Sequence, residues 1–394
     1  MAPVILVLNS GSSSIKFSLY SATIEQLKGQ ISGLGAEPHL ALVSQASGLT
    51  IDRALEGEEG RTHRTALAAL LPVLEQELGG LPVDAVGHRV VHGGVSHTRP
   101  LTITDTVLRD LKELEPLAPL HQPHNLAGIE AARAAFPDAL QTACFDTAFH
   151  RKHPWVNDTF ALPRSLYDEG VRRYGFHGLS YEFICSYLQE TRPEVFQGKV
   201  VVAHLGNGAS MCAIRNGQSI GSTMGFTALD GLPMGTRCGQ LDPGVVLYLL
   251  TTKSMSADAV SDLLYRNSGL KGLSGISQDM RSLSESTDPR AAEAIDYFVF
   301  RIRRELGAMA AVLNGLDTLV FTGGIGENAA LIRQRVCAEQ DWLGLSIDEA
   351  RNTAREEDIS AANSQTKVLV IPTNEEEMIR RHTETLLYAD ASTR

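Results

Sequence analysis

Cysteine is scarce in this chain of 394 residues, and long apolar runs are missing. The five cysteines lie far apart and form no C-x-x-C pair, which argues against a disulfide framework and against a structural zinc site. The apolar run at residues 4–8 is short and has no basic leader, and no stretch approaches the roughly 18–20 residues of a membrane span. We therefore expect a soluble cytoplasmic protein with no membrane partner.

An excess of positive charge is missing as well. Lys and Arg number 35 against 46 Asp and Glu, which gives a formal net charge of −11. Such a chain has no overall field to attract nucleic acid, so no nucleic-acid partner is expected and any bound nucleotide must meet local positive groups. The hydrophobic content of 43% and the charged content of 21% are typical of a globular protein and exclude a disordered chain, a fibre and a coiled coil.

Two strand–turn–strand units predict a duplicated architecture. In the first, strands at residues 4–8 and 15–20 flank the polar turn 9–14. In the second, strands at residues 200–204 and 209–214 flank an Asn-Gly turn. Because the units lie about 200 residues apart and each opens a new segment, we interpret them as the starts of two related domains.

Helical patterns separate the predicted strands. Residues 64–78 and 126–136 are expected to be helical, and a long amphipathic helix is expected to begin at Pro289 behind the N-cap Asp288. Alternating strands and helices favour an α/β fold. We place one domain at residues 1–149 plus a C-terminal helix at about 380–394, and the other at residues 150–379.

Three small-residue turns that follow strands are candidates for phosphate binding: residues 9–14, 204–208 and 323–328. Small residues let backbone N–H groups approach a phosphate closely. Each turn alone is weak, because Ser-rich and Asn-Gly turns are common in ordinary hairpins and the first turn lacks the Gly-Lys-Ser/Thr of a Walker loop. Together they predict a nucleotide cleft.

Arg89, Arg237 and His177 are the candidate positive groups. Arginine suits bidentate capture of a carboxylate or phosphate, although a surface ion pair is the ordinary alternative for either arginine. Histidines are clustered between residues 88 and 177, and most are expected to be structural. His177, between glycines in a predicted loop, is the exception.

Asp146 and Glu375 are the candidate carboxylates, because each follows a predicted strand, where α/β sheets place active residues. Mg²⁺ commonly takes one or two carboxylates together with phosphate oxygens and water. The alternative for Glu375 is that the acidic run 375–377 merely begins a solvated helix. The segment 121–124 is not expected to be helical, because Pro123 disfavours helix for the residue before it.

Eight ordered segments together resemble the acetate kinase family, within the actin, hexokinase and heat-shock-70-like superfamily. The resemblance implies two ribonuclease-H-like (actin-like ATPase) domains flanking a nucleotide cleft, and a homodimer. It also implies reversible, Mg²⁺-dependent transfer of the ATP γ-phosphate to acetate by direct in-line attack, giving acetyl phosphate and ADP. The segments are residues 8–16, 87–94, 145–150, 174–178, 204–208, 235–237, 323–328 and 372–376.

The resemblance also assigns roles to residues of this sequence. Asn9 and Glu375 correspond to the pair of residues associated with the metal ion. That ion is Mg²⁺, for which Mn²⁺ could substitute. The implied catalytic residues are Asp146, His177 and Arg237. The implied substrate-binding residues are Arg89 for the carboxylate and Val91, Leu120 and Phe176 for the acetate methyl. The implied ATP contacts are Lys16, His204, Leu205, Gly206, Asn207, Gly208, Asp279, Met280, Arg281, Gly324, Ile325, Gly326, Glu327 and Asn328.

Two departures from the family pattern leave alternatives open. Ala228 stands where the family commonly has proline. If this position lines the acyl pocket, the alanine enlarges the pocket, so a propionate or butyrate kinase is an alternative. A non-acyl ATPase of the same fold is a further alternative. Gln240 stands where the family often has aspartate, and we expect this loss of charge to affect Arg237.

Because acetate is already ionised at neutral pH, we expect Asp146 to position an arginine or the hydrated metal and not to act as a base.

Overall fold

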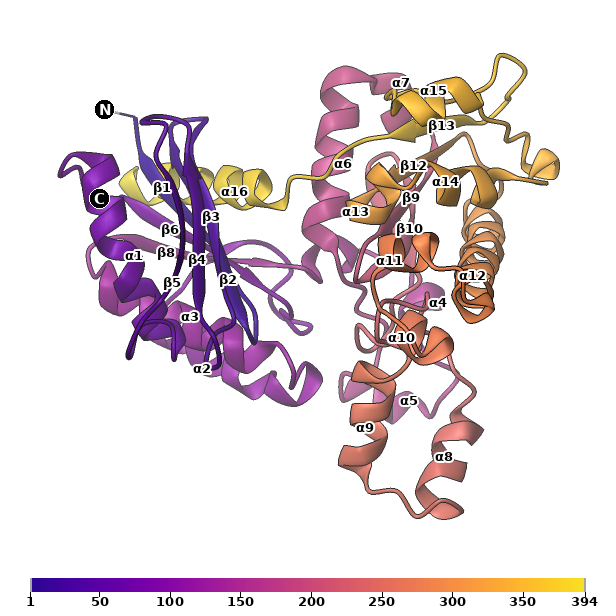
Figure 1. Cartoon of the computed structure of the whole chain (residues 1–394), viewed down its shortest axis with the longest axis horizontal. Helices are drawn as coiled ribbons and strands as arrows, with labels where there is room; N and C mark the ends of the chain where they lie inside the picture. Colours follow the sequence, from indigo (N-terminus) through magenta and orange to yellow (C-terminus); the bar gives the residue numbers. More distant parts are fainter. Residues whose placement is uncertain (1, 393–394) are drawn as a thin grey trace. The chain divides into compact units, whose positions relative to one another are not determined.

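The computed structural model describes residues 2–392, which form two compact units (Figure 1). The N-terminal unit holds the described residues up to Phe149 and those from Asn374 onward, and the C-terminal unit spans His150–Thr373. Within the described residues, no helix is long and apolar enough to cross a membrane.

An eight-stranded sheet forms the centre of the N-terminal unit, in the order β5-β4-β3-β2-β1-β6-β8-β7. Strand β1 runs antiparallel to β2 and parallel to β6, which runs parallel to β8. The carboxyl ends of β1, β6 and β8 therefore meet at one edge. The strands are β1 (Val4–Ser10), β2 (Ser14–Ser21), β3 (Ile24–Ser32), β4 (His39–Ser44), β5 (Thr50–Ala54), β6 (Ala85–Val90), β7 (Leu101–Thr102) and β8 (Leu140–Phe145).

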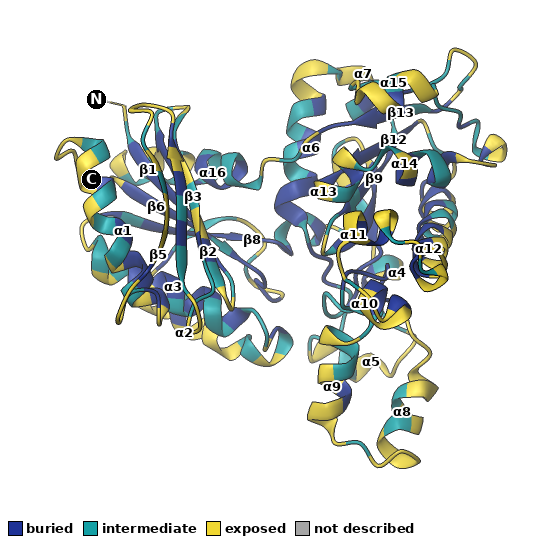
Figure 2. Cartoon of the chain, viewed as in Figure 1, coloured by how far each residue is buried: buried dark blue, intermediate teal, exposed yellow. Residues whose placement is uncertain are grey.

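Helices cover this sheet on both faces. Leu6 and Leu8 of β1 join a buried cluster with Leu67 and Leu70 of α1, and every residue from Val4 to Leu8 is buried, as a central strand requires (Figure 2). On the other face, α16 packs against β6. The helices are α1 (His63–Leu78), α2 (Asp105–Glu113), η1 (Glu115–Leu117), α3 (Gln122–Ala135) and α16 (Glu375–Ala391). A short 3₁₀ helix, η2 (Ala148–His150), lies where the chain passes from one unit to the next.

A five-stranded sheet forms the centre of the C-terminal unit, in the order β11-β10-β9-β12-β13. Strand β9 is antiparallel to β10 and parallel to β12, which is parallel to β13. The strands are β9 (Lys199–Leu205), β10 (Ala209–Arg215), β11 (Gln218–Ser222), β12 (Thr318–Thr322) and β13 (Lys367–Val370). The helices are α4 (Trp155–Asp158), α5 (Arg164–Asp168), α6 (Gly178–Thr191), α7 (Pro193–Phe196), α8 (Pro243–Thr251), α9 (Ala257–Arg266), α10 (Gly269–Ser274), α11 (Met280–Glu285), α12 (Pro289–Leu313), α13 (Gly323–Asn328), α14 (Ala330–Cys337), η3 (Asp341–Leu343) and α15 (Glu349–Ala354).

The two sheets repeat one strand order. The series β3-β2-β1-β6-β8 and β11-β10-β9-β12-β13 each place three antiparallel strands beside two parallel ones. This repetition confirms the predicted duplicated α/β architecture of two actin-like ATPase domains.

The long helix confirms its predicted start, whereas α3 does not. A carboxylate oxygen of Asp288 accepts from the Arg290 N–H at 2.9 Å, and Pro289 opens α12. Helix α3 begins at Gln122, four residues earlier than predicted, with Pro123 in its first turn. The expectation that Pro123 keeps residues 121–124 out of a helix is therefore wrong. In the first turn the N–H that proline lacks has no intrahelical partner to lose.

The docking of α16 depends on a glycine of β6. A Cβ atom on Gly87 would lie 2.4 Å from Thr383 Oγ1 and 2.6 Å from Ile379 Cγ2. Thr383 also hydrogen-bonds across to Thr142 of β8 at 2.7 Å. Helix and sheet are thus in contact at a point where no side chain fits.

We expect Gly87→Ala to lower the free energy of unfolding by about 1–3 kcal/mol, because it overpacks this contact. Urea denaturation measures the change. In a double-mutant cycle, Thr383→Ala should recover part of the loss, since it removes one of the two clashing atoms. Strictly additive effects would contradict the direct contact.

Candidate active site

Three of the residues singled out from the sequence gather around Arg89 at the carboxyl edge of the N-terminal sheet. The Arg89 guanidinium donates from Nη2 to Asp146 Oδ2 at 2.6 Å and from Nε to both Asp146 oxygens at 3.1 Å. Its Nη1 donates to Asn9 Oδ1 at 3.3 Å, and its Nε lies 3.6 Å from Glu375 Oε2. These residues meet because β1, β6 and β8 end side by side and α16 begins next to them.

The charges of this cluster are unequal. Burial, together with the nearby charge of Asp146, raises the pKa of Glu375 to about 7 against the lowering effect of Arg89. The pKa of Arg89 is raised, because Asp146 and Glu375 outweigh the opposing effect of burial. Arg89 therefore remains a cation. Exposed Lys16 is paired with Asn9 across the β1–β2 hairpin and adds a second positive group nearby.

The oxygen atoms of Asn9, Asp146 and Glu375 are the kind of donor that Mg²⁺ or Mn²⁺ takes. Across residues 2–392, no group of three or more His, Cys, Asp or Glu side chains is placed to hold a metal ion. The donor set therefore fits an ion that takes most of its ligands from phosphate and water, and it does not form a closed protein cage.

Asn125 ties the strand ends of this cluster together, and sequence reasoning missed it. Its buried Oδ1 accepts from the Val91 N–H at 2.9 Å, and its Nδ2 donates to the Ser10 carbonyl at 2.6 Å. Asn125 thus fixes the residue after Asn9 and the segment after Arg89. Of the predicted methyl-binding wall, Val91 is buried behind β6 and Leu120 is half-buried before α3.

In the C-terminal unit, His177 and Arg237 converge on Gly208. A Cβ atom on Gly208 would lie 3.1 Å from His177 Nε2 and 3.2 Å from Arg237 Nη2. The His177 ring stacks on His204 with 4.3 Å between centroids, and Arg237 Nη1 donates to the Ala228 carbonyl at 2.7 Å. His177 has a φ of +57°, a left-handed backbone conformation that is costly for a residue with a side chain.

A cavity of about 680 Å³ in the C-terminal unit lies beside Gly206 and α13. This volume is in the range of small-molecule sites. Residues that sequence reasoning missed also line it, among them Gln278, Ser284 and Arg355, which carry no local signal of nucleotide binding. The predicted ATP contacts that line it are Gly206, Asn207, Asp279, Met280, Arg281, Gly324, Ile325 and Asn328.

The other predicted ATP contacts lie elsewhere. Leu205 and Gly326 are buried within β9 and α13. Glu327 Oε1 accepts from the backbone N–H of Gly323 at 2.9 Å and of Thr373 at 3.2 Å, so this side chain holds the start of α13 in place. His204 and Gly208 belong to the cluster around His177, whereas Lys16 belongs to the N-terminal unit. Phe176 is buried next to His177 in sequence.

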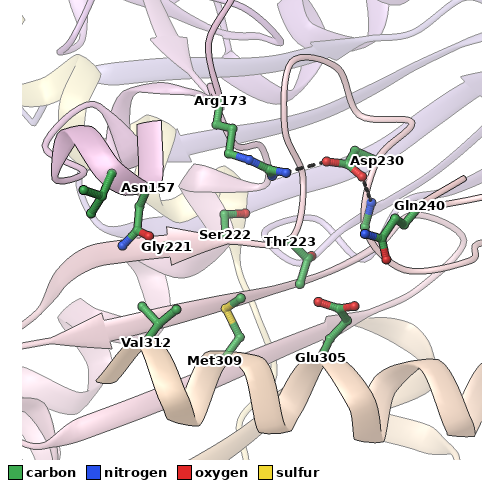
Figure 3. Close-up of a pocket in the computed structure, with 12 residues that line it drawn as sticks. Asn157, Arg173, Gly221, Ser222, Thr223, Asp230, Gln240, Glu305, Met309 and Val312 are labelled. Carbon is green, nitrogen blue, oxygen red and sulfur yellow. Dashed lines mark hydrogen bonds and ion pairs between the residues drawn. The ribbon is translucent and has the colours of Figure 1, made fainter. Parts of the chain in front are cut away.

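A second, smaller cavity of about 200 Å³ lies between β11 and α12 (Figure 3). Arg173 forms an ion pair with Asp230 there at 3.2 Å. Gln240 lines the same cavity, and its Oε1 accepts from Arg301 at 3.2 Å and from Arg304. The glutamine that was expected to alter the charge around Arg237 is therefore bonded to two arginines of α12.

The neighbouring histidines have structural contacts, as expected. His150 hydrogen-bonds to Ser219 Oγ at 2.8 Å and to the Phe176 carbonyl at 2.9 Å. Burial lowers the pKa of His150 to about 3 and that of His153 to about 2. Both rings are therefore neutral in the folded protein at ordinary pH.

These two rings predict acid sensitivity of the C-terminal unit. The unfolded chain gains protons near pH 6.5 while the folded chain does not, so the free energy of unfolding should fall as pH falls below about 6.5. Each histidine should contribute a slope of about 1 kcal/mol per pH unit. Urea denaturation between pH 7.5 and 5 measures this slope, which His150→Asn should reduce. An unchanged slope in the variant would contradict the assignment.

The chain matches the acetokinase family over residues 4–381. A protein named acetate kinase from Methylocella silvestris is 55% identical, and the match covers 98% of both chains. The crystal structure of Porphyromonas gingivalis acetate kinase is 36% identical in sequence and matches with a TM-score of 0.88. The match covers 98% of this chain and 100% of that chain. A propionate kinase from Francisella tularensis is 35% identical, with a TM-score of 0.89 and the same coverage.

This fold, with its two actin-like ATPase domains, and these similarities define a kinase that acts on a carboxylate. The chain belongs to the acetokinase family.

The ion pair at Arg89 allows a direct test of the role of Asp146. We expect Asp146→Asn to lower kcat/KM for the carboxylate substrate by about 100-fold or more, because the amide cannot hold the guanidinium at both oxygens. The pH profile should keep its shape, since no base is lost. Steady-state kinetics from pH 6 to 9 measure both.

Asp84→Asn is the matched control for that test. Asp84 Oδ2 accepts from the Val4 N–H at 2.7 Å, outside the cluster. Like Asp146→Asn, this variant replaces a hydrogen-bonded carboxylate by an amide. It should change the free energy of unfolding without changing kcat/KM. Near-native turnover of Asp146→Asn would show that Asp146 has no role in catalysis.

Proposed function

We propose that this enzyme reversibly transfers the γ-phosphate of ATP to acetate, giving acetyl phosphate and ADP by direct in-line attack. The observation that carries the proposal is the end-to-end similarity to proteins named acetate kinase, together with an arginine held at a sheet edge by a buried carboxylate. Acetate and ATP are its substrates.

Arg89 binds the acetate carboxylate in this proposal. Acetate is ionised at neutral pH, so the obstacle is its repulsion from the polyanionic phosphate and not a missing base. Asp146 fixes the guanidinium through Nε and Nη2, so its orientation is set before substrate arrives. Val91, Leu120 and Phe176 supply apolar contacts to the methyl group.

His177 and Arg237 stabilise the transferring phosphoryl group. Charge in this reaction spreads over three equatorial oxygens, and catalysis consists mainly of alignment and positive charge. Their convergence on bare Gly208 supports this role, because two donors point to one place that no side chain occupies.

ATP occupies the cavity beside α13 in this proposal, and Lys16 is a further ATP-binding residue. The ion is Mg²⁺, for which Mn²⁺ can substitute, and Asn9 and Glu375 are the residues associated with it. When bound, the ion neutralises charge on the β- and γ-phosphates. Glu375 must give up any proton it holds before it can serve as a ligand.

The enzyme is a homodimer in this proposal. Helix α8 supports it, because all of its residues are exposed or half-buried (Figure 2). Several of these residues are large and apolar. Val245, Leu247, Tyr248 and Leu250 are each more than a third exposed, a pattern typical of a surface that a partner covers. A cytoplasmic location belongs to the same proposal, since ATP is the phosphate donor.

Trapping with hydroxylamine tests the reaction. Purified protein with ATP, Mg²⁺ and acetate should give acetyl hydroxamate, because hydroxylamine attacks an acyl phosphate. ADP release without hydroxamate would overturn the proposal in favour of a non-acyl ATPase.

Acyl preference follows from the ratio of kcat/KM for acetate, propionate and butyrate, and acetate should be preferred. Ala228→Pro should raise the acetate-to-propionate ratio about 10-fold or more, since one methylene in an apolar pocket corresponds to about 1–3 kcal/mol. An unchanged ratio would show that position 228 does not line the acyl pocket.

A further inference from the structure

Hydroxyl groups stand behind the two stacked histidines of the C-terminal unit. Ser210 Oγ lies 2.8 Å from His177 Nδ1, and Ser180 Oγ lies 2.8 Å from His204 Nδ1. Ser180 and Ser210 are both fully buried. Each ring therefore has its Nδ1 on a buried hydroxyl, and the Nε2 of His177 lies on the side of Gly208.

The hydroxyl behind His177 continues into a chain. The Tyr181 hydroxyl hydrogen-bonds to Ser210 Oγ, and Tyr181 is fully buried in the first turn of α6. Burial raises the pKa of the Tyr181 phenol well above its ordinary value, so the phenol keeps its proton. The order Tyr181–Ser210–His177 thus runs from a buried phenol to an imidazole nitrogen.

The acidity of the two hydroxyl groups suggests a direction for this chain. A phenol is more acidic than an alkyl hydroxyl, so the direction in which Tyr181 donates and Ser210 accepts is the one the proposal takes. Serine has one proton, which is then directed to His177 Nδ1. A neutral imidazole that accepts at Nδ1 carries its proton on Nε2.

We propose that Ser210 and Tyr181 are positioning residues that hold His177 with its ring proton on Nε2, directed at the transferring phosphoryl group. This inference rests on the function proposed above, which supplies the phosphoryl group. The neutral donor adds to the cation of Arg237, whose Nη2 approaches the same point. Preorganised donors of this kind act where charge develops in the transition state.

In the proposed tautomer the His177 ring is neutral and donates from Nε2. Arg237 lies on the Gly208 side and His204 stacks on the ring face, so a proton added to His177 would meet a cation and a second imidazole. A neutral ring that still donates from Nε2 avoids this repulsion. The hydroxyl chain secures that tautomer.

Nitrogen NMR of the full-length enzyme, labelled with ¹⁵N at histidine, reports the tautomer directly. Long-range ¹H–¹⁵N spectra at pH 7.5 should show a protonated Nε2 and an unprotonated Nδ1 for His177, whose signals are assigned by their loss in His177→Asn. Ser210→Ala should move His177 toward the Nδ1-protonated form, and Tyr181→Phe should do so in part. A wild-type proton on Nδ1, or unchanged signals in Ser210→Ala, would overturn the proposal.

Ser180→Ala is the matched control, because it removes the equivalent hydroxyl from His204. It should shift the signals of His204 and leave the tautomer of His177 as in the wild type. Equal shifts of both rings in both serine variants would mean that a general packing defect, and not the hydroxyl chain, sets the tautomers.

Kinetics give the second readout. Ser210→Ala should lower kcat by about 10- to 100-fold while KM for acetate and ATP changes less than about twofold, because only the transition-state contact weakens. Ser210→Thr, which keeps the hydroxyl, should restore most of kcat. A rise in KM without a fall in kcat would contradict the proposal. Thermal unfolding checks that each variant folds, and Tyr181→Phe decides the question if Ser210→Ala does not.

The two proposals fail separately. Absence of acetyl hydroxamate with the wild-type enzyme would refute the proposed reaction, whereas the NMR tautomer would still be as assigned. The wrong tautomer in an enzyme that does form acetyl hydroxamate would refute only the role of Ser210 and Tyr181.

Discussion

The buried ion pair between Arg89 and Asp146 is the interaction on which the N-terminal site depends. Asp146 is only 1% exposed, so without Arg89 its charge would be buried without a partner, a state that costs several kcal/mol. The pair forms because β6 and β8 are parallel neighbours in which Val90 lies opposite Phe145. Asp146 therefore leaves its strand at the level where the Arg89 side chain arrives. The strand register, and not a flexible loop, sets the position of the cation.

Local patterns were sufficient to predict much of the fold from the sequence. The β1–β2 hairpin, the two-strand unit at β9 and β10, and the cap of α12 at Asp288 each depend on residues that are near neighbours in the chain. Pro123 shows the limit of such rules, because its effect depends on where in the helix it falls. The order of the strands, which decides the fold, could be expected only from the duplicated pattern and the family resemblance.

The residues that hold the site side chains in place were harder to predict from the sequence. Asn125 bonds to Ser10 across 115 positions, and Ser210 bonds to His177 across 33, so no short motif contains either pair. The predicted effect of Gln240 on Arg237 rested on their closeness in sequence. The Gln240 side chain instead contacts arginines of α12 that lie more than 60 positions away. Residues that act through another side chain carry no chemical signature of their own.

The two clusters orient their positive groups by different means. Arg89 is held by a carboxylate, and the Arg237 guanidinium donates to the Ala228 backbone carbonyl. Both oxygens of Asp146 accept hydrogen bonds from the Arg89 guanidinium. A sugar kinase needs a base, because a hydroxyl must lose its proton to attack. A carboxylate does not, so an aspartate that orients an arginine and takes no proton is compatible with the proposed carboxylate acceptor.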